Sequence, residues 1–297
     1  GRPAVPLLLS WRERHGKEIA ARRGERYGIA SMPRPQGALC WFHAASVGET
    51  ATVLPLIEAI QQKRPDLHML LTTGTVSSAR FVEGRKIAGL IHQFVPLDVP
   101  QYVTAFLDHW RASLASFVES EIWPNLLLEL SQRDIPVVVV NARMSKGSFR
   151  RWRKRPQVSN PLFSRFHTVI AQNKTYALRF TDLGVTRVLN GGNLKIDVPP
   201  LPVDAIALDA LRAQTRERQV WLAASTHADE EKVAGAAHLA IRAKHPSLLT
   251  IIAPRHPERA DTIAGDLTAM GLTVARRSKN EPISGTTDVY LADTVGE

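Results

Sequence analysis

The chain has 297 residues, of which 44% are hydrophobic and 22% are charged, as in an ordinary globular protein with room for two domains. Its 38 Lys and Arg residues outnumber 28 Asp and Glu residues, and the net charge of +10 favours anionic partners: phosphorylated substrates, acidic membrane surfaces or nucleic acid. The single cysteine excludes an intrachain disulfide, and no apolar run reaches the roughly 20 residues of a transmembrane helix.

The first 30 residues combine a short apolar stretch with a basic cluster. The stretch 6–11 ends in Trp11, and six Arg and Lys residues follow between positions 12 and 26. A second basic run, 150–155, contains Trp152. A solvated surface would explain both runs, but the aromatic residues also favour binding to an anionic membrane surface or to phosphate. We expect residues 1–30 to be a membrane-proximal segment, the remnant of a hydrophobic anchor.

From residue 31 to 197, short β-rich runs alternate with helical patterns, which is typical of a parallel sheet with crossover helices. The sequence predicts strands at 39–43, 68–72, 91–95, 114–119, 136–141 and 168–171. It predicts helices at 50–63, 77–88, 101–110, 125–133 and 174–183, with Ser77 and Asn173 as N-caps.

A proline-rich link at 197–202 separates this region from a second alternating one. There the sequence predicts helices at 203–217, 229–244 and 257–270, and strands at 220–224, 248–253, 272–275 and 289–291. The expected fold class is therefore α/β of the GT-B type: two Rossmann-like, doubly wound domains, 31–197 and 198–297, facing a cleft, the second C-terminally incomplete. Dehydrogenases and epimerases can share this architecture.

Several ligand motifs do not occur in the sequence. There is no GxGxxG fingerprint, no GxxxxGK[ST] loop, no Cys/His metal spacing and no DxD pair. We therefore expect neither a metal nor another cofactor.

Glu49 is the first candidate for catalysis. It lies in the segment AASVGET, which follows an apolar strand and opens a helix. Open α/β sheets bind ligands at the carboxyl ends of their strands, so this carboxylate could take a proton from a substrate hydroxyl. The preceding Gly48 would let a ligand approach the backbone. The alternative is that Glu49 only complements the helix dipole.

Four further segments follow predicted strands. The segment 119–125 places two acids before a helix that opens with Pro124, and 190–197 combines glycines with Lys195. The segment 225–231 could bind phosphate at a helix start, and 254–259 sets Arg255 and His256 between two prolines. Caps and plain loops are the alternatives for the first three, whereas the rigid basic turn at 254–259 favours a function.

Taken together and in order, eight segments resemble the family of Kdo transferases, which attach 3-deoxy-D-manno-octulosonic acid (Kdo) to the lipid A precursor. They are AASVGET, LLTTGT, ESEIWPN, NARMS, GNLKID, ASTH, PRHPER and ADTVGE. The resemblance as a whole runs from about Arg22 to Glu297. The resemblance implies an inverting, membrane-associated glycosyltransferase of lipopolysaccharide biosynthesis. CMP-Kdo would be the donor and the cytoplasmic face of the inner membrane the location.

The resemblance also implies roles for individual residues. Glu49 would be the general base, and Glu121 would support the site. The first domain would bind the acceptor, with a pocket formed by Ser46, Gly48, Thr73, Gly74 and Asn193. The second would bind CMP-Kdo, and the expected donor-binding residues are Lys195, Ser225, Thr226, Arg255, His256, Gly296 and Glu297. A glycine-rich segment usual in the family is expected after the end of this chain.

Three alternatives stay open from the sequence: a GT-B transferase or epimerase that uses a UDP-sugar, a basic nucleic-acid-binding protein, and a non-catalytic membrane scaffold. No nucleic acid is expected as a partner, because the sequence lacks basic–aromatic repeats and any recognised binding module.

Overall fold

The computed structural model describes residues 4–120, 122–197 and 203–294. The chain divides into two compact units, Gly1–Pro199 and Pro200–Glu297, called here the first and the second unit. The division falls within the proline-rich link that the sequence analysis placed between two domains.

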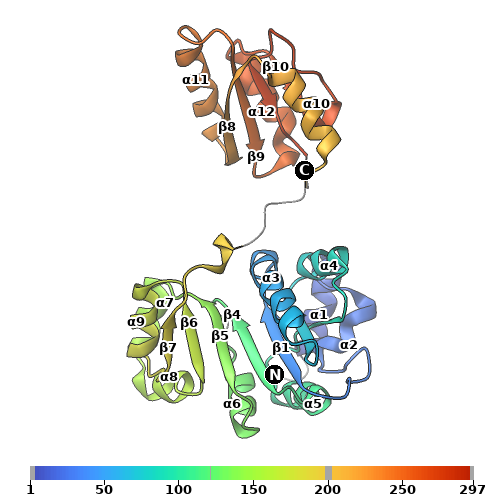
Figure 1. The fold of residues 1–297 in the computed structure, drawn as a ribbon, viewed down its shortest axis with the longest axis vertical. Helices are drawn as coiled ribbons and strands as arrows, with labels where there is room; N and C mark the ends of the chain where they lie inside the picture. Colours follow the sequence, from blue (N-terminus) through green and yellow to red (C-terminus); the bar gives the residue numbers. More distant parts are fainter. Residues whose placement is uncertain (1–3, 121, 198–202, 295–297) are drawn as a thin grey trace. The chain divides into compact units, whose positions relative to one another are not determined.

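The first unit is built on a parallel sheet of seven strands in the order β3-β2-β1-β4-β5-β6-β7 (Figure 1). The predicted α/β fold class is thus confirmed, and six strands lie within two residues of their predicted bounds. The strands are β1 (Leu39–Ala44), β2 (His68–Thr73), β3 (Leu90–Phe94), β4 (Leu114–Val118), β5 (Val137–Ala142), β6 (Thr168–Ala171) and β7 (Val188–Asn190).

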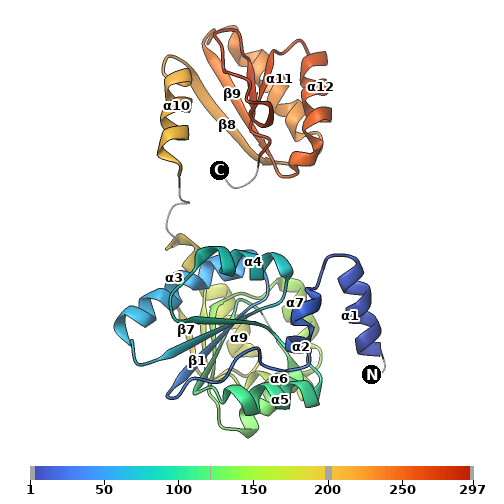
Figure 2. The same ribbon diagram turned by 90° about the vertical axis from the view of Figure 1, so that its right-hand side faces the viewer.

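Side chains that alternate along β1 enter two different cores. Trp41 packs with the helices α5 (Pro100–Trp110), α6 (Pro124–Gln132), α8 (Pro156–Phe163) and α9 (Lys174–Asp182). Phe42 packs with α3 (Val47–Lys63) and α4 (Val76–Arg85) on the other face. Successive strand residues point to opposite faces, and every residue of β1 is buried. Helices therefore cover both sides of the sheet, as Figure 2 shows.

Some local predictions need correction. The helix α3 begins at Val47, three residues before the predicted start, and α4 is capped by Thr75 and not by Ser77. Asn173 caps α9 as predicted. Helices α1 (Ala4–Arg14), α2 (Arg23–Arg26) and α7 (Lys146–Arg153) lie in or beside the apolar and basic stretches for which the sequence predicted no helix.

The N-terminal segment is fixed to the sheet by Arg26, which is 3% exposed. Its guanidinium donates to the Glu18 carboxylate at 3.0 Å and to the carbonyls of Val95 and Gly74 at 3.1 and 2.8 Å. It also lies over the Phe94 ring, 4.5 Å from the centroid. One buried cation thus joins the segment before β1 to the loops that follow β2 and β3.

The second unit has a parallel sheet in the order β10-β11-β9-β8. Its strands are β8 (Gln219–Thr226), β9 (Leu248–Pro254), β10 (Val274–Arg276) and β11 (Val289–Leu291), and its helices are α10 (Ala205–Thr215), α11 (Glu230–Arg242) and α12 (Ala260–Ala269). The edge strand β8 leaves Val220 and Leu222 45% and 57% exposed.

Substitution of Arg26 should destabilise the first unit. Arg26→Met would leave the buried Glu18 carboxylate with Arg12 as its remaining ion-pair partner and would remove the donor from the carbonyls of Val95 and Gly74, a loss typically worth about 1–3 kcal/mol. Arg26→Lys keeps the charge but not the fork of donors, so it should fall between wild type and Met. Urea unfolding followed by tryptophan fluorescence measures the order. Equal stability of Arg26→Met and of a control at the exposed Arg14, Arg14→Met, would contradict it.

A second prediction concerns His92 on β3, whose pKa is lowered to about 3 by burial and by the positive charge of Arg22. Arg22 Nη2 lies 3.2 Å from Nδ1, and Nε2 lies 3.0 Å from the Thr73 hydroxyl. Since arginine can only donate, Nδ1 accepts and Nε2 carries the proton.

The unfolded chain, with a histidine pKa of about 6.5, therefore takes up this proton first as the pH falls. Stability from neutral His92 is present above pH 6.5 and is lost below it, by up to about 1.4 kcal/mol per pH unit. Urea unfolding at pH 7, 6 and 5 should show a smaller loss for His92→Gln than for wild type. The matched control is the exposed His167, as His167→Gln. An unchanged pH dependence in His92→Gln would contradict the assignment.

Candidate functional site

The strand order of the first unit reverses between β1 and β4. Open α/β sheets bind ligands at such a point, outside the carboxyl ends of the strands. The loop after β1 carries Glu49, and the loop after β4 carries Glu119 and Trp123. The rings of His43 on β1 and Trp123 lie 6.1 Å apart, so these two loops are neighbours.

Glu49 is held in place at the N-terminus of α3. Ser46 accepts a hydrogen bond from the Glu49 backbone N–H, and the half-buried Glu49 carboxylate accepts from the Ala45 N–H at 2.8 Å and from the Ser46 hydroxyl at 3.2 Å. This reciprocal cap orders the side chain. It is also the helix-end role that was the alternative to catalysis, but an ionised carboxylate has about four acceptor sites and can serve both purposes.

The two glycines of the predicted acceptor pocket have different surroundings. A Cβ built on Gly74 would lie 2.8 Å from the Ala45 carbonyl oxygen, so the loop after β2 packs directly on the loop that carries Glu49. A Cβ on Gly48 would meet nothing within 4 Å. Thr73 is fully buried, and its hydroxyl contacts His92 at 3.0 Å.

Glu119 is a buried acid of the segment after β4; Glu121, which the sequence analysis favoured, lies outside the described residues, and its role stays a prediction. Glu119 is 1% exposed and has a φ of +62°, which is strained for a residue with a Cβ. Its carboxylate pairs with Arg143, which follows β5, and with Lys195 Nζ at 2.8 Å. Two cations on one carboxylate leave a surplus of positive charge, and both cations are about half exposed.

A second polar contact supports the loop that carries Lys195. The Leu194 N–H donates to Asn141 Oδ1 at 3.0 Å, and Asn141 is 1% exposed at the end of β5. Asn193 caps the following turn by accepting from the Lys195 N–H at 3.1 Å. The structure therefore gives Asn193 a structural contact. Its predicted role in the acceptor pocket stays a prediction.

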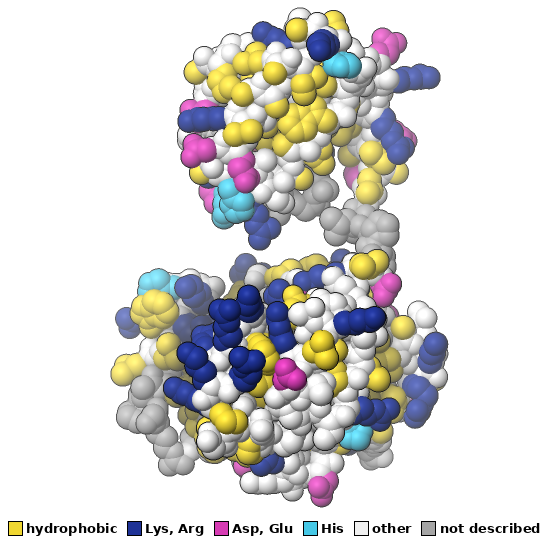
Figure 3. Space-filling view, turned by 90° about the vertical axis from the view of Figure 1, so that its left-hand side faces the viewer, with side chains coloured by type: hydrophobic (Ala, Val, Ile, Leu, Met, Phe, Trp, Pro, Cys, Tyr) yellow, Lys and Arg dark blue, Asp and Glu magenta, His cyan; other side chains and the backbone are white. Residues whose placement is uncertain are grey.

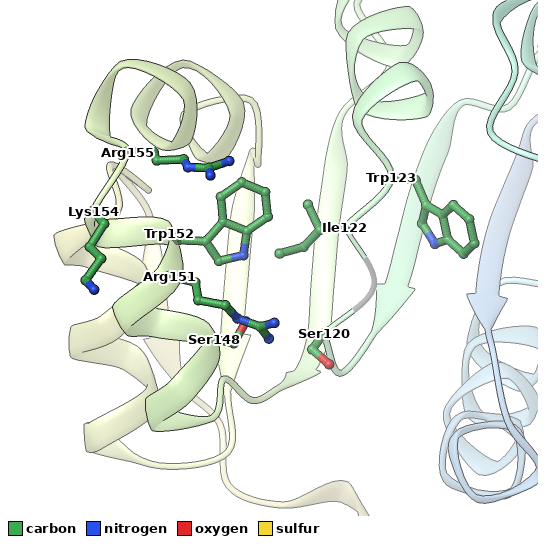
Figure 4. A pocket seen from close by; sticks show the side chains of 8 residues that line it. All are labelled: Ser120, Ile122, Trp123, Ser148, Arg151, Trp152, Lys154 and Arg155. Carbon is green, nitrogen blue, oxygen red and sulfur yellow. The ribbon is translucent and has the colours of Figure 1, made fainter. Parts of the chain in front are cut away.

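A hollow of about 660 Å³ lies beside this edge of the sheet, between the loop after β4 and the helix α7. It is within the size range of small-ligand sites. Its lining residues are Ser120, Ile122, Trp123, Ser148, Arg151, Trp152, Lys154 and Arg155 (Figure 4). Lys and Arg side chains gather on the side of the first unit that carries α7 to α9 (Figure 3).

The second unit brings together four of the predicted donor-binding residues. Ser225 and Thr226 end β8, Arg255 follows the neighbouring strand β9, and the Arg255 N–H donates to the Thr226 carbonyl at 2.9 Å. Arg255 and His256 are exposed, and the rings of His256 and His227 lie 6.1 Å apart. This edge therefore offers hydroxyl, guanidinium and imidazole groups to a ligand.

Two residues that the sequence analysis did not select hold this edge together. Glu231 on α11 is 3% exposed, accepts from the Thr226 hydroxyl at 3.0 Å and pairs with Arg259 at 3.0 Å. Burial alone would raise the pKa of Glu231, but the hydrogen bonds from Arg259 and Thr226 outweigh burial and lower it. Glu231 and Arg259 are 28 positions apart in the sequence, so local sequence patterns do not predict that they form a pair.

Three predicted site residues, Glu121, Gly296 and Glu297, lie outside the described residues. The assigned roles of all the other site residues stay predictions. Among the described residues, no group of three His, Cys, Asp or Glu side chains could hold a metal ion. In the same part of the chain, no helix is long and apolar enough to cross a membrane.

Comparison with known proteins gives one consistent family. The sequence profile described as 3-deoxy-D-manno-octulosonic-acid transferase matches residues 21–198. A probable mitochondrial 3-deoxy-D-manno-octulosonic acid transferase of Arabidopsis thaliana is 37% identical, with 99% of this chain and 68% of that protein aligned. The Haemophilus influenzae 3-deoxy-D-manno-octulosonic acid transferase is 36% identical, with 99% and 69% aligned. The chain thus spans about two thirds of these relatives.

Solved structures agree on the fold. A UDP-GlcNAc 2-epimerase from Neisseria meningitidis superposes with a TM-score of 0.55 at 13% identity, over 87% of this chain and 72% of that one. The corresponding enzyme from Listeria monocytogenes gives 0.57 at 11% identity, over 86% and 68%. At these identities the similarity concerns the fold alone. The profile match and the two aligned relatives decide the family: this chain belongs to the 3-deoxy-D-manno-octulosonic acid (Kdo) transferases.

Proposed function

We propose that the chain transfers Kdo from CMP-Kdo to the lipid A precursor in lipopolysaccharide biosynthesis, with inversion at the anomeric carbon. Membership of the Kdo transferase family supports the transferred sugar and the transferase chemistry. The donor and the acceptor follow from the resemblance of the motifs. The observation that carries the proposal is the fixed carboxylate of Glu49 beside the point where the strand order reverses.

In the proposed mechanism, Glu49 accepts the proton of an acceptor hydroxyl as that oxygen attacks the anomeric carbon. The new glycosidic C–O bond forms while the bond from this carbon to the CMP phosphate breaks. The bonding electron pair leaves with the phosphate. The cap at Ala45 and Ser46 keeps the carboxylate in one orientation, which lowers the entropic cost of reaching the transition state.

Positive groups would stabilise the anionic substrates without a metal, and we propose that none is required. Arg255 and His256 would bind the CMP phosphate in the second unit. In the first unit, Arg143 and Lys195 exceed the charge of Glu119 by one, so they can attract an anionic group of the substrate. Lys195 would then act beside the acceptor site as well as toward the donor.

The location that we propose is the cytoplasmic face of the inner membrane. Leu7, Leu8 and Trp11 on α1 are 73%, 47% and 50% exposed. Basic residues follow them on the same helix, and apolar and basic side chains together are typical of helices that lie on an anionic membrane surface.

Substitution of the proposed base gives a direct test. Glu49→Gln in a protein active in Kdo transfer should lower kcat by about 10²–10⁴-fold, because a positioned base contributes that much. Its affinity for CMP-Kdo, measured by isothermal titration, should stay within about twofold of wild type. Turnover close to wild type would refute the base assignment. Tighter binding of UDP-sugars than of CMP-Kdo would support the UDP-sugar alternative instead.

Membrane binding should depend on salt and on the exposed apolar residues of α1. Vesicles with anionic lipid should bind the chain at 50 mM salt and lose it progressively toward 500 mM, because exposed charges are screened. The double substitution Leu8→Ser and Trp11→Ser should weaken binding to the same vesicles. Binding that is indifferent to salt, or equal on neutral vesicles, would count against the proposed surface.

A further inference from the structure

The side chain of Trp152 lines two hollows of the first unit. The first is the basic hollow of about 660 Å³ described above. The second is an apolar groove of about 230 Å³ between α6 and α8, whose lining residues are Pro124, Leu128, Trp152, Val158, Pro161, Leu162 and Arg165. A single ligand could therefore occupy both hollows if its two parts differ in polarity.

The basic hollow has the donors that a phosphate monoester needs. Arg151 and Arg155 extend from the chain on either side of the Trp152 indole, toward the loop with Ser120 and Ile122 (Figure 4). Both guanidinium groups are exposed and can donate in pairs to phosphate oxygens. Ser120 and Ser148 add hydroxyl groups, and none of the described residues that line the hollow is acidic.

The side chain of Trp152 lines both hollows and is held in place by a neighbouring aromatic ring. Its ring packs edge-to-face on Phe163, with centroids 5.4 Å apart, and Phe163 is fully buried. The indole therefore presents a fixed aromatic surface to each side, and a ligand does not have to order it on binding.

The groove on the other side of Trp152 is apolar except at its end. Leu128 is 39% exposed and Val158 56% exposed, so both offer apolar surface to water. Arg165 is the one charged residue among the described residues that line the groove, and its guanidinium donates to the Ser131 hydroxyl at 2.7 Å. Burying these side chains against a hydrocarbon chain would be favourable, at roughly 25 cal/mol per Å².

We propose that these hollows form one binding site for an amphiphilic phosphate monoester. The phosphate lies between Arg151 and Arg155, and one hydrocarbon chain of the same molecule passes Trp152 into the groove beside Leu128 and Val158. This inference rests on the proposed function, since the occupant it names is a phosphorylated, acylated acceptor lipid. A phosphopeptide would use the basic hollow alone and would leave the groove empty.

Binding of alkyl phosphates to the purified chain tests the site without any donor. The probes are inorganic phosphate, then butyl, hexyl and octyl phosphate below their micelle concentrations, and octanol as the chain without charge. Titration calorimetry should show that alkyl phosphates bind more tightly than inorganic phosphate. Each buried methylene contributes about 0.8 kcal/mol, which corresponds to about fourfold in affinity, until the groove is filled.

Two pairs of substitutions test the basic hollow and the apolar groove separately. Arg151→Ala with Arg155→Ala should weaken every phosphate probe by about tenfold or more and leave the gain per methylene unchanged. Leu128→Asp with Val158→Asp should abolish the gain per methylene and leave inorganic phosphate binding within about twofold. The matched controls are Lys146→Ala, an exposed cation on α7 outside the hollow, and Leu178→Asp, an exposed leucine on α9. Both should bind like wild type.

Several results would overturn the site. Equal affinity for inorganic phosphate and octyl phosphate would show that the groove takes no chain. An unchanged gain per methylene in the double Asp variant would place the chain elsewhere. A loss in Lys146→Ala equal to that in the double Ala variant would show a diffuse basic surface.

Failure of the site and failure of the proposed function are distinguishable. If Glu49→Gln transfers Kdo normally but alkyl phosphates bind as described, the base assignment is wrong and the site stands. If transfer depends on Glu49 but both pairs of pocket variants keep the wild-type KM for the acceptor, the site is wrong and the function stands. A raised KM with unchanged kcat is the expected result, because the pocket binds ground state and transition state alike.

Discussion

The ion group around Glu119 joins the parts of the first unit that the rest of the site depends on. Its carboxylate is buried at the end of β4 and meets Arg143 after β5 and Lys195 after β7. Removing both cations would leave a buried carboxylate without a compensating charge, which is costly in a protein interior. The contact thus joins the three loops, and Glu119 makes it from a backbone conformation with positive φ.

A similar constraint acts on the other side of the reversal point. Glu49 is fixed by Ala45 and Ser46, the Ala45 loop is packed against Gly74, and Gly74 is bonded to Arg26. The N-terminal segment carries the exposed apolar residues of α1. A short series of direct contacts thus connects this segment to the loop that holds Glu49, the proposed base. The proposed membrane contact of that segment would therefore be linked to the position of Glu49 through Arg26.

Much of this fold could be predicted from the sequence, because the strands of a buried parallel sheet are continuous β-rich runs. The predicted order of strand and helix also placed Glu49 correctly at a helix start. The helix α7 was missed because its hydrophobic residues, Phe149 and Trp152, are surrounded by Arg and Lys. The contact of Glu119 with Lys195 was missed because 76 positions separate them, and only the folded sheet brings the two together.

The same reasoning explains why the sequence did not single out Glu119. Its segment carries two acids after one strand, and a buried acid needs partners that only the tertiary structure provides. For the basic run 150–155, the sequence left both a solvated surface and an anion-binding surface open. In the folded chain Arg151 and Arg155 extend on either side of the Trp152 indole, which packs on Phe163 (Figure 4), so the sequence indicated the charge of this surface and not its shape.

The contrast between Gly74 and Gly48 has a consequence for redesign of the enzyme. At position 74 even a methyl group would collide with a neighbouring carbonyl, so no other amino acid fits without moving the adjacent loop. Position 48 faces open space one residue before the proposed base. A library that seeks new acceptor alcohols can therefore vary residue 48 freely in size, within the limits of helix propensity, while residue 74 stays constant.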